Sequence, residues 1–316
     1  MIRVVVLDDY QDVATSYGPW DDLGSDVTVE TVTEHLSGAL LLDRLQPADV
    51  IVAMRERTAF PAPLLDQLPK LRLLVTTGAG NASIDIAAAH RRGVTVCGTG
   101  LLPTPTAELT WGLILALLRH IPADDAAIRA GRWQENVGVE VAGKTLGIIG
   151  LGKLGQRVAR VGLALDMTVI AWSQNLDHGH CRGLGVEPVG KRDLLVASDI
   201  VTLHLKLSDR TRGVIGPEEI ALMRPTTYLV NTARGPLVDT DALVAALRDG
   251  RIAGAGIDVY DEEPLPADHP LRSTPNTVVT PHVGYVTDGT YRLFFADIVE
   301  DIAAWRSGVP IRVVGA

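Results

Sequence analysis

The sequence predicts an α/β protein with two doubly wound domains, each built on a parallel sheet. Three observations carry this prediction. Short runs of β-branched residues alternate with segments of helical periodicity along the whole chain, which is typical of parallel sheets covered by helices on both faces. A glycine-rich turn follows one of these runs near residue 150. A cluster of turn-forming residues interrupts the pattern near residue 100.

The expected strands fall into two groups, one on each side of that interruption. The first group comprises residues 2–7, 27–31, 50–53, 71–75 and 94–96. Helical periodicity at 36–45 and 84–91 fills two of the intervals in this group. The second group comprises residues 145–149, 168–171, 200–204, 228–231, 256–259 and 278–280. Each group is large enough for a sheet of its own, and the length of 316 residues agrees with two domains.

Turn-forming residues mark where the chain passes from one domain to the other. Residues 98–105 are rich in Gly, Pro and Thr, and an apolar helix is expected directly afterwards, at 106–119. A second break follows at Gly284, before a helical run at about 287–305. We expect residues 1–100 and 286–316 to form a discontinuous substrate domain, with a nucleotide-binding domain at 101–285 inserted in it. An interdomain cleft would hold the substrate.

The composition argues against several classes of function. With 47% hydrophobic and 21% charged residues, the chain suits compact folded domains. The formal net charge of −9 opposes binding to a phosphate backbone, so no nucleic-acid partner is expected. No window approaches the ~18 continuous apolar residues of a membrane span, and the first residues lack a signal-peptide pattern. Cys97 and Cys181 are the only cysteines, which favours free thiols in the cytoplasm.

Three glycines spaced as in dinucleotide-binding proteins follow the expected strand at 145–149. Gly150 permits the turn from strand to helix, Gly152 lets the backbone approach a pyrophosphate, and Gly155 lets helix and strand pack closely. The motif is completed by Lys153 and Leu154. The helix that follows would present free N–H groups to the phosphates. This arrangement is typical of a Rossmann-like domain that binds NAD or NADP.

The residue expected to meet the adenine ribose leaves the choice between NAD and NADP open. An NAD-preferring site usually has an Asp or Glu about 20 residues after the glycines, at the end of the next strand. Ser173 occupies that position here, and no carboxylate follows until Asp177. The missing acid removes repulsion against a 2′-phosphate, which favours tolerance of NADP. An arginine to pair with that phosphate is not obvious, Arg182 being the nearest one downstream.

Three side chains in the last third of the chain have the types needed to reduce a 2-keto acid. Such a reduction needs a cation for the substrate carboxylate and a proton donor for the oxygen that becomes the hydroxyl. Arg234 follows a strand and can grip a carboxylate through two parallel hydrogen bonds. A histidine such as His282 is suited to proton transfer, and a carboxylate such as Glu263 can orient its ring. Because the carboxyl ends of parallel strands meet at one edge, we predict that these three form a catalytic group.

These residues give the chain a resemblance to the D-isomer-specific 2-hydroxyacid dehydrogenases, a family that includes phosphoglycerate dehydrogenase and glyoxylate/hydroxypyruvate reductase. The resemblance spans nearly the whole chain. It rests on four motifs in the family's order and spacing, namely the glycine motif, residues 231–235, residues 258–264, and Pro281 with His282. It implies that Arg234 binds and polarises the substrate, that Glu263 pairs with His282, and that His282 transfers the proton. It also implies a homodimer, formed near the apolar helix that contains Glu108.

The resemblance further implies which residues contact the cofactor and the substrate. Asp258 matches the position that hydrogen-bonds the nicotinamide carboxamide. The other implied cofactor contacts are His204, Thr232, Ala233 and Gly284. Residues 76–81 resemble the family's loop whose backbone N–H groups hold the substrate carboxylate, with Ala79 and Gly80 as the expected donors. From its place after the strand at 50–53, Arg55 would line the cleft and favour a substrate with a further anionic group, unless it belongs to an exposed charged loop.

Three residues depart from the family's pattern. Ser173 replaces the ribose-binding acid, and Lys206 stands where a proline is common, two residues after His204. Tyr285 follows Gly284, where a small residue is usual. A tyrosine beside the predicted catalytic histidine would narrow the pocket or contact the substrate, so the family does not predict which 2-keto acid is used.

Two alternative functions remain open on the sequence alone. Formate dehydrogenase is a relative with the same architecture, but it has a glutamine at the position of Glu263, which counts against it. Corepressors that sense NAD(H) share the fold and retain the catalytic triad, but they carry partner-binding clefts or disordered tails. No metal site is expected, because the ligand-type residues at 178–181 have no matching second pair elsewhere.

Overall fold

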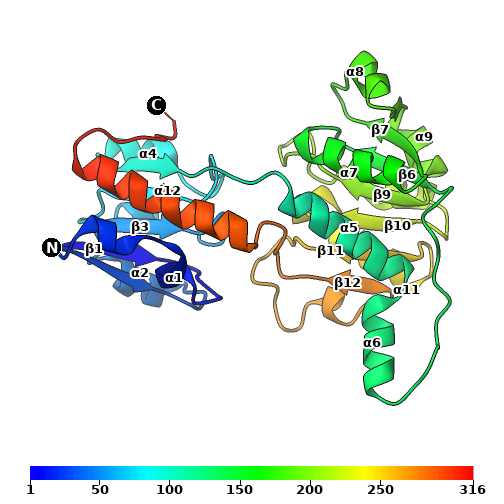
Figure 1. The fold of residues 1–316 in the computed structure, drawn as a ribbon, viewed down its shortest axis with the longest axis horizontal. Coiled ribbons are helices and arrows are strands. Elements are labelled where there is room, and N and C mark those ends of the chain that lie inside the picture. The colour runs from blue at the N-terminus through cyan, green and yellow to red at the C-terminus, as the bar shows by residue number, and fades with distance from the viewer. Residues whose placement is uncertain (316) are drawn as a thin grey trace. The chain divides into compact units, whose positions relative to one another are not determined.

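The computed structural model describes residues 1–315, and these divide into two compact units (Figure 1). The first unit comprises Met1–Leu102 together with the chain from Val286 onward. The second unit comprises Pro103–Tyr285. The first unit is therefore built from both ends of the chain, whereas the second is contiguous.

Five parallel strands form the sheet of the first unit, in the order β2-β1-β3-β4-β5. Their bounds are β1 (Ile2–Val6), β2 (Val27–Thr31), β3 (Val50–Ala53), β4 (Leu73–Thr76) and β5 (Thr95–Gly98). Every residue of β3 and β4 is buried, as expected for apolar strands in a parallel sheet that is covered on both faces. The helical segments are α1 (Ala14–Tyr17), η1 (Trp20–Leu23), α2 (Gly38–Leu45), α3 (Ala62–Leu65), α4 (Ile86–Arg91) and α12 (Asp288–Arg306).

The long helix α12 brings the end of the chain back to the first unit. It begins after Thr287, whose side chain accepts the N–H of Thr290 as an N-cap. Along the helix, Phe294, Phe295 and Ile298 are fully buried. Since α12 contacts β4 and α1, these side chains supply part of the core of the first unit.

After α12, the chain pairs with the outer edge of β5. The N–H of Val314 donates to the carbonyl of Val96, and the N–H of Gly98 donates to the carbonyl of Arg312. The bridge between Cys97 and Val313 is antiparallel. The last residues thus satisfy backbone groups that an edge strand would otherwise leave unpaired.

Seven parallel strands form the sheet of the second unit, in the order β12-β11-β10-β9-β6-β7-β8. This is a doubly wound order, and its direction reverses between β6 and β9. The strands are β6 (Thr145–Ile149), β7 (Thr168–Trp172), β8 (Glu187–Pro188), β9 (Ile200–Leu203), β10 (Tyr228–Asn231), β11 (Gly254–Ile257) and β12 (Thr277–Val279). The helices are α5 (Pro105–Leu118), α6 (Ile121–Arg129), α7 (Lys153–Ala164), α8 (His178–Gly183), α9 (Lys191–Ala197), α10 (Pro217–Leu222), α11 (Thr240–Arg248), η2 (Gly235–Leu237) and η3 (Pro270–Arg272).

Successive side chains along each strand point to opposite faces of this sheet, and each face packs into its own hydrophobic core. Ile149 and Leu203 belong to the core that includes residues of α9, α10 and α11, which we call the α9 face. Ile148 and Ile200 belong to the core that includes residues of α5 and α7, which we call the α7 face. Helices therefore cover both faces of the sheet, as Figure 1 also shows.

The two parallel-sheet units confirm the predicted fold class, and all of the predicted strands are present with bounds that shift by at most two residues. The strand expected at 256–259 is β11, which begins earlier, at a glycine and an alanine that carry little β-propensity. β8 was not predicted; it has only two residues and lies at the sheet edge. Across residues 1–315, no helix is both long and apolar enough to span a bilayer.

Candidate active site

The glycine turn lies between β6 and α7, in the second unit. Gly150 has a φ of +102°, a conformation that side chains disfavour. A β-carbon at Gly155 would collide with the carbonyl oxygen of Gly150, so only glycine lets the first turn of α7 pack against the strand end. At Gly152, in contrast, no atom lies within 4 Å of the position of a β-carbon. Lys153 and Leu154 are the first two residues of α7, directly after this space. The N-terminus of the helix favours an anionic group such as a pyrophosphate.

Ser173, Gly150 and His204 form one row at the carboxyl edge of the sheet. The N–H of Gly150 donates to the carbonyl of Trp172 at 2.8 Å, and the N–H of His204 donates to the carbonyl of Ile149 at 2.8 Å. Ser173, Gly150 and His204 are therefore the first residues after β7, β6 and β9, and they lie side by side where these strands end. This row is where a doubly wound domain binds a dinucleotide.

The imidazole of His204 is uncharged at neutral pH. Burial lowers its pKa to about 4. Its Nε2 atom lies 3.1 Å from the hydroxyl of Thr202, which lies on the same side of β9. His204 thus adds a polar group to the row without adding positive charge.

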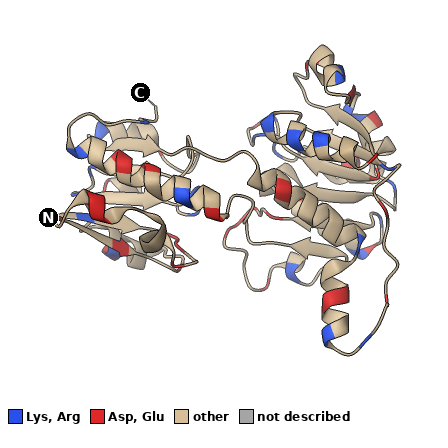
Figure 2. Cartoon of the chain, viewed as in Figure 1, with Lys and Arg blue, Asp and Glu red and all other residues tan. Residues whose placement is uncertain are grey.

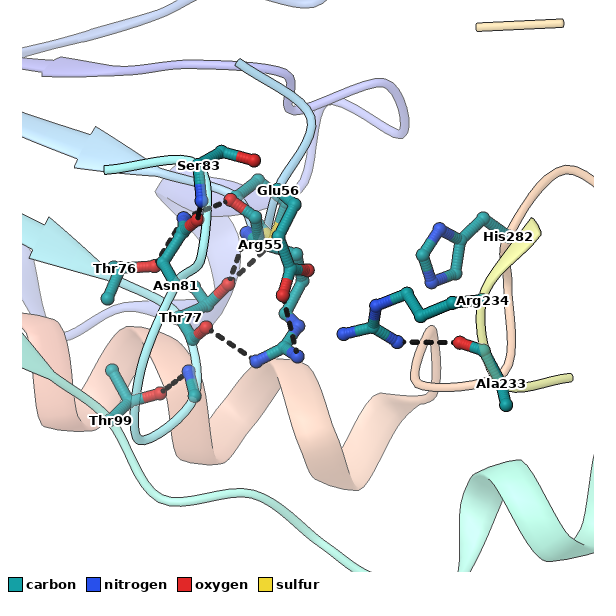
Figure 3. A network of polar contacts seen from close by, with 12 residues as sticks. Arg55, Glu56, Thr76, Thr77, Asn81, Ser83, Thr99, Ala233, Arg234 and His282 are labelled. Atoms are coloured by element: carbon teal, nitrogen blue, oxygen red, sulfur yellow. Dashed lines mark hydrogen bonds and ion pairs between the residues drawn. The ribbon is translucent and has the colours of Figure 1, made fainter. Parts of the chain in front are cut away.

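The turn after β10 positions Arg234. The side chain of Asn231 closes the turn, because its amide donates to the carbonyl of Arg234 at 2.9 Å and its oxygen accepts the N–H of Ala233 at 3.0 Å. Thr232 is buried, and its hydroxyl lies 2.8 Å from that of Thr110 on α5. Nη1 of the half-buried Arg234 donates to the carbonyl of Ala233 at 2.7 Å (Figure 3). This contact restrains one end of the guanidinium.

His282 and Glu263 form a close pair in the same unit. Nδ1 of His282 lies 2.6 Å from Oε2 of Glu263. Oε1 of Glu263 accepts the N–H of Tyr260 at 2.9 Å, so both carboxylate oxygens are held. A carboxylate at Nδ1 keeps that nitrogen protonated and leaves Nε2 as the nitrogen that exchanges a proton.

Asp258 fixes the loop that carries His282. It is fully buried, and its Oδ1 accepts the hydroxyl of Thr280 at 2.6 Å and the N–H of Val283 at 2.9 Å. Its Oδ2 accepts the N–H of Gly284 at 2.9 Å. Burial raises the pKa of the Asp258 carboxyl, against the opposing effect of these hydrogen bonds. The loop is thereby held on both sides of His282, whose φ of +53° lies in the left-handed region.

Tyr285 packs against the imidazole of His282. The two ring centres are 5.6 Å apart and the planes are nearly perpendicular, at 81°. Such an edge-to-face contact is favourable between aromatic rings. Tyr285 is buried, so its ring limits the space beside His282.

In the first unit, Arg55 and the loop after β4 hold one another (Figure 3). The backbone N–H of Arg55 donates to the hydroxyl of Thr77 at 2.9 Å, and its guanidinium donates to the carbonyl of Thr77 at 3.0 Å. The guanidinium also lies 3.7 Å from the carboxylate of Glu56. The amide of Asn81 donates to the carbonyl of Arg55 at 2.5 Å and to the hydroxyl of Thr76 at 3.0 Å. Arg55 is thus part of an ordered network rather than an isolated surface charge.

The same loop leaves backbone donors available. Its base is held by Thr99, which accepts the N–H of Gly78 at 2.7 Å and donates its own N–H to the carbonyl of Gly78 at 3.0 Å. Within residues 1–315, the N–H groups of Ala79 and Gly80 donate no hydrogen bond. Successive free N–H groups of this kind suit an anion such as a carboxylate.

Two supports of the site were not predicted. The N–H of Tyr260 that holds Glu263 is a backbone group, and no residue type signals it. Gly235 could have been noticed as a glycine directly after Arg234. A β-carbon there would overlap the carbonyl group of Tyr260, so Gly235 lets the two turns touch.

The residues at 178–181 do not converge on a common point. His178 and His180 are exposed on α8, whereas Cys181 is fully buried in the core of the α7 face. In the described part of the chain, no group of three or more His, Cys, Asp and Glu side chains is arranged to hold a metal ion.

Comparisons with known proteins show which family this chain resembles. The family model for the NAD binding domain of D-isomer specific 2-hydroxyacid dehydrogenases matches residues 111–284. A glyoxylate reductase from Aeropyrum pernix is 40% identical over 285 residues, which cover 87% of this chain and 85% of that protein. A D-3-phosphoglycerate dehydrogenase from Methanocaldococcus jannaschii is 35% identical over 306 residues, which cover 96% of this chain and 57% of that protein. The crystal structure of a phosphoglycerate oxidoreductase from Vibrio cholerae o395 superimposes with a TM-score of 0.93 at 34% identity, covering 98% of this chain and 100% of that one.

These similarities confirm the resemblance inferred from the four sequence motifs. They do not favour the formate dehydrogenase or the corepressor as alternatives. The chain belongs to the D-isomer specific 2-hydroxyacid dehydrogenase family.

Proposed function

We propose that this chain reduces a small 2-keto acid to the corresponding 2-hydroxy acid, with Arg234, Glu263 and His282 as its catalytic residues. As a member of its family, the chain is a nicotinamide-dependent oxidoreductase that acts on CH–OH groups. The observation that carries the residue assignment is the 2.6 Å pair between His282 and Glu263. It provides an oriented proton donor beside a turn that presents an arginine.

In the proposed reaction, Arg234 binds the substrate carboxylate and polarises the keto oxygen. His282 donates a proton from Nε2 to that oxygen while the keto carbon receives a hydride, so that C=O becomes CH–OH. Glu263 holds the ring in place and stabilises its protonated form before the transfer. In the reverse direction, Nε2 of His282 takes the proton back from the hydroxyl.

The glycine turn fits the nicotinamide cofactor, which supplies or accepts the hydride when it is bound. The space beside Gly152 and the N-terminus of α7 suit the pyrophosphate. We assign the cofactor contacts to Gly150, Gly152, Lys153, Leu154, Gly155, Ser173, His204, Thr232, Ala233, Asp258 and Gly284. The matched family domain binds NAD, and the missing acid at Ser173 supports tolerance of NADP as well.

In the first unit, we assign substrate binding to Ala79, Gly80 and Arg55. The N–H groups of Ala79 and Gly80 are suited to a carboxylate because they have no other acceptor in residues 1–315. Arg55 adds a cation that the network with Thr77 and Asn81 holds in place. This set favours a 2-keto acid with a further anionic or polar group.

We also propose that the chain is a cytoplasmic homodimer. On α6 and the segment after it, Ile121, Ile128, Trp133 and Val137 are each at least half exposed. Figure 1 shows α6 extending away from the sheet of the second unit, and exposed apolar side chains on such an element suit contact with another protein surface. Cys97 and Cys181 are free, buried thiols, as suits a reducing compartment.

The first test follows the absorbance of the reduced nicotinamide with NADH and NADPH against glyoxylate, hydroxypyruvate, pyruvate, phenylpyruvate and oxaloacetate. We expect turnover with at least one acid, and loss of at least 100-fold in kcat for His282→Ala. His90→Ala is the matched control, because His90 is exposed at the end of α4 and should leave turnover unchanged. Turnover that survives His282→Ala would refute the assigned proton donor.

A further inference from the structure

Ser173, Gly150 and His204 form a row at the carboxyl edge of the second sheet. Lys206 lies two residues beyond His204, at one end of this row. At the other end, Ser173 stands where an NAD-preferring site has an acid. We propose that Lys206 and Ser173 together bind the 2′-phosphate of NADP, so that the chain prefers NADP(H) to NAD(H). This inference rests on the nicotinamide-dependent function proposed above and specifies its cofactor.

The position of Lys206 follows from the side-chain alternation beyond β9. Leu203 lies in the core of the α9 face, and Leu205 and Leu207 pack against the same core. Lys206, between those two leucines, is exposed and therefore points away from that core. The segment is fixed, because the carbonyl of Lys206 accepts the hydroxyl of Thr211 at 2.8 Å. Lys206 thus extends from the side of the sheet that bears the glycine turn.

Ser173 reaches the same side from β7. Trp172 packs against the core of the α9 face and Ala171 belongs to the core of the α7 face, so the next residue, Ser173, returns toward the α7 face. Between β7 and β9 lies only β6, which ends at Gly150. Two strand spacings amount to about 10 Å. A phosphate group placed between Ser173 and Lys206 can accept a hydrogen bond from the serine hydroxyl on one side and from the ammonium group of the long lysine side chain on the other.

The charges around this row favour an added anion. Lys206 has no ion-pair partner within residues 1–315, whereas Lys191 is paired with Glu219 at 2.8 Å. The neighbouring helix α7 carries three basic residues and no acidic one (Figure 2). Ser173 stands where an NAD-preferring site has a carboxylate, so this residue itself does not repel a 2′-phosphate, which is close to doubly charged at pH 7.

The test compares the dissociation constants of NAD⁺ and NADP⁺, measured by quenching of tryptophan fluorescence and by calorimetry. The wild-type protein should bind NADP⁺ more tightly, and Lys206→Ala should reduce the preference for NADP⁺ about tenfold, which corresponds to about 1.4 kcal/mol. Lys206→Arg should keep the preference, and Ser173→Asp should reverse it. Lys144→Ala is the matched control, because it removes one charge at the opposite edge of the same sheet, directly before β6. The binding of 2′,5′-ADP is compared with that of 5′-AMP, which lacks the 2′-phosphate, to measure the contribution of that group. Raising the salt concentration should weaken the binding of 2′,5′-ADP strongly and that of 5′-AMP only slightly.

The outcomes separate this inference from the proposed function. A wild-type protein that binds NAD⁺ as tightly as NADP⁺, or more tightly, overturns the inference and leaves the dehydrogenase function standing. Equal preference in wild type and Lys206→Ala overturns the role of Lys206. Failure to bind either dinucleotide overturns both proposals.

Discussion

Replacing Gly235 by alanine should disable the site without touching a catalytic side chain. The new β-carbon would overlap the carbonyl carbon of Tyr260 and lie 2.6 Å from the backbone nitrogen of Asp261. Ordinary contacts of a β-carbon begin at 3.4 Å, and the obstructing atoms here are backbone rather than the end of a flexible side chain. The segment at Tyr260 must therefore move by roughly 1 Å, a displacement large enough to disturb catalysis.

That movement reaches both members of the proposed proton-transfer pair. The N–H of Tyr260 holds Glu263, and the hydroxyl of Tyr260 donates to the carbonyl of Thr280 at 2.8 Å, at the start of the loop that carries His282. A misplacement of about 1 Å costs about 100-fold in rate, or about 2.7 kcal/mol of transition-state stabilisation. Overpacking should also lower the free energy of unfolding by about 1–3 kcal/mol.

Steady-state kinetics on the best 2-keto acid and urea denaturation measure the two effects separately. We expect kcat of Gly235→Ala to fall about 100-fold at a temperature where the variant remains folded. Gly183→Ala is the matched control, because its β-carbon would meet nothing within 4 Å. A Gly235→Ala protein that is destabilised yet keeps kcat within about twofold would refute the reasoning, since the Tyr260 segment would then not position Glu263 and His282.

Three further predictions concern single side chains. Glu263→Gln keeps the size of the side chain but loses its charge, so kcat should fall about 100-fold with little change in KM, and an unchanged kcat would exclude Glu263 as the group that orients His282. Tyr285→Phe should retain kcat because the ring contact remains, whereas Tyr285→Ala should lower kcat about tenfold and lower KM for phenylpyruvate; a Phe variant as slow as the Ala variant would assign the role to the hydroxyl instead. Burial raises the pKa of Asp301 to about 7 although Arg312 lies 3.0 Å from it, so its contribution to stability is complete below pH ~4 and is lost as the pH rises through 7. The free energy of unfolding of Asp301→Asn, measured by urea denaturation, should therefore rise relative to that of the wild type between pH 4 and 8, by on the order of 3 kcal/mol. A difference between the two proteins that does not vary with pH would contradict the shifted titration.

Much of the second unit could be predicted because its polar residues follow recognisable strands. Gly150, Arg234 and Asp258 each come directly after a strand or within three residues of one, and parallel strands bring their carboxyl ends to one edge. The sequence therefore predicted which residues share that edge. The structure adds the distances, of which the 2.6 Å contact between Glu263 and His282 is the most informative.

What the sequence could not predict depends on backbone groups and on long-range burial. No residue type marks the N–H of Tyr260 or the free N–H groups of Ala79 and Gly80, because every residue except proline carries one. The raised pKa of Asp301 depends on contacts between α12 and the rest of its unit, which only the folded chain creates. The strand β8 was not predicted, because two residues at the edge of a sheet form no periodic pattern.

The discontinuous first unit also sets the order in which the protein can be completed during synthesis. Its five strands leave the ribosome first, but Phe294, Phe295 and Ile298 of α12 follow nearly 200 residues later. At about 5–20 residues per second, the nascent sheet waits on the order of 10–40 s for that part of its core. The contiguous second unit is translated in full during this interval. The first unit therefore begins to be made before the second unit and is completed after it, and its apolar surface is exposed to molecular chaperones in the meantime.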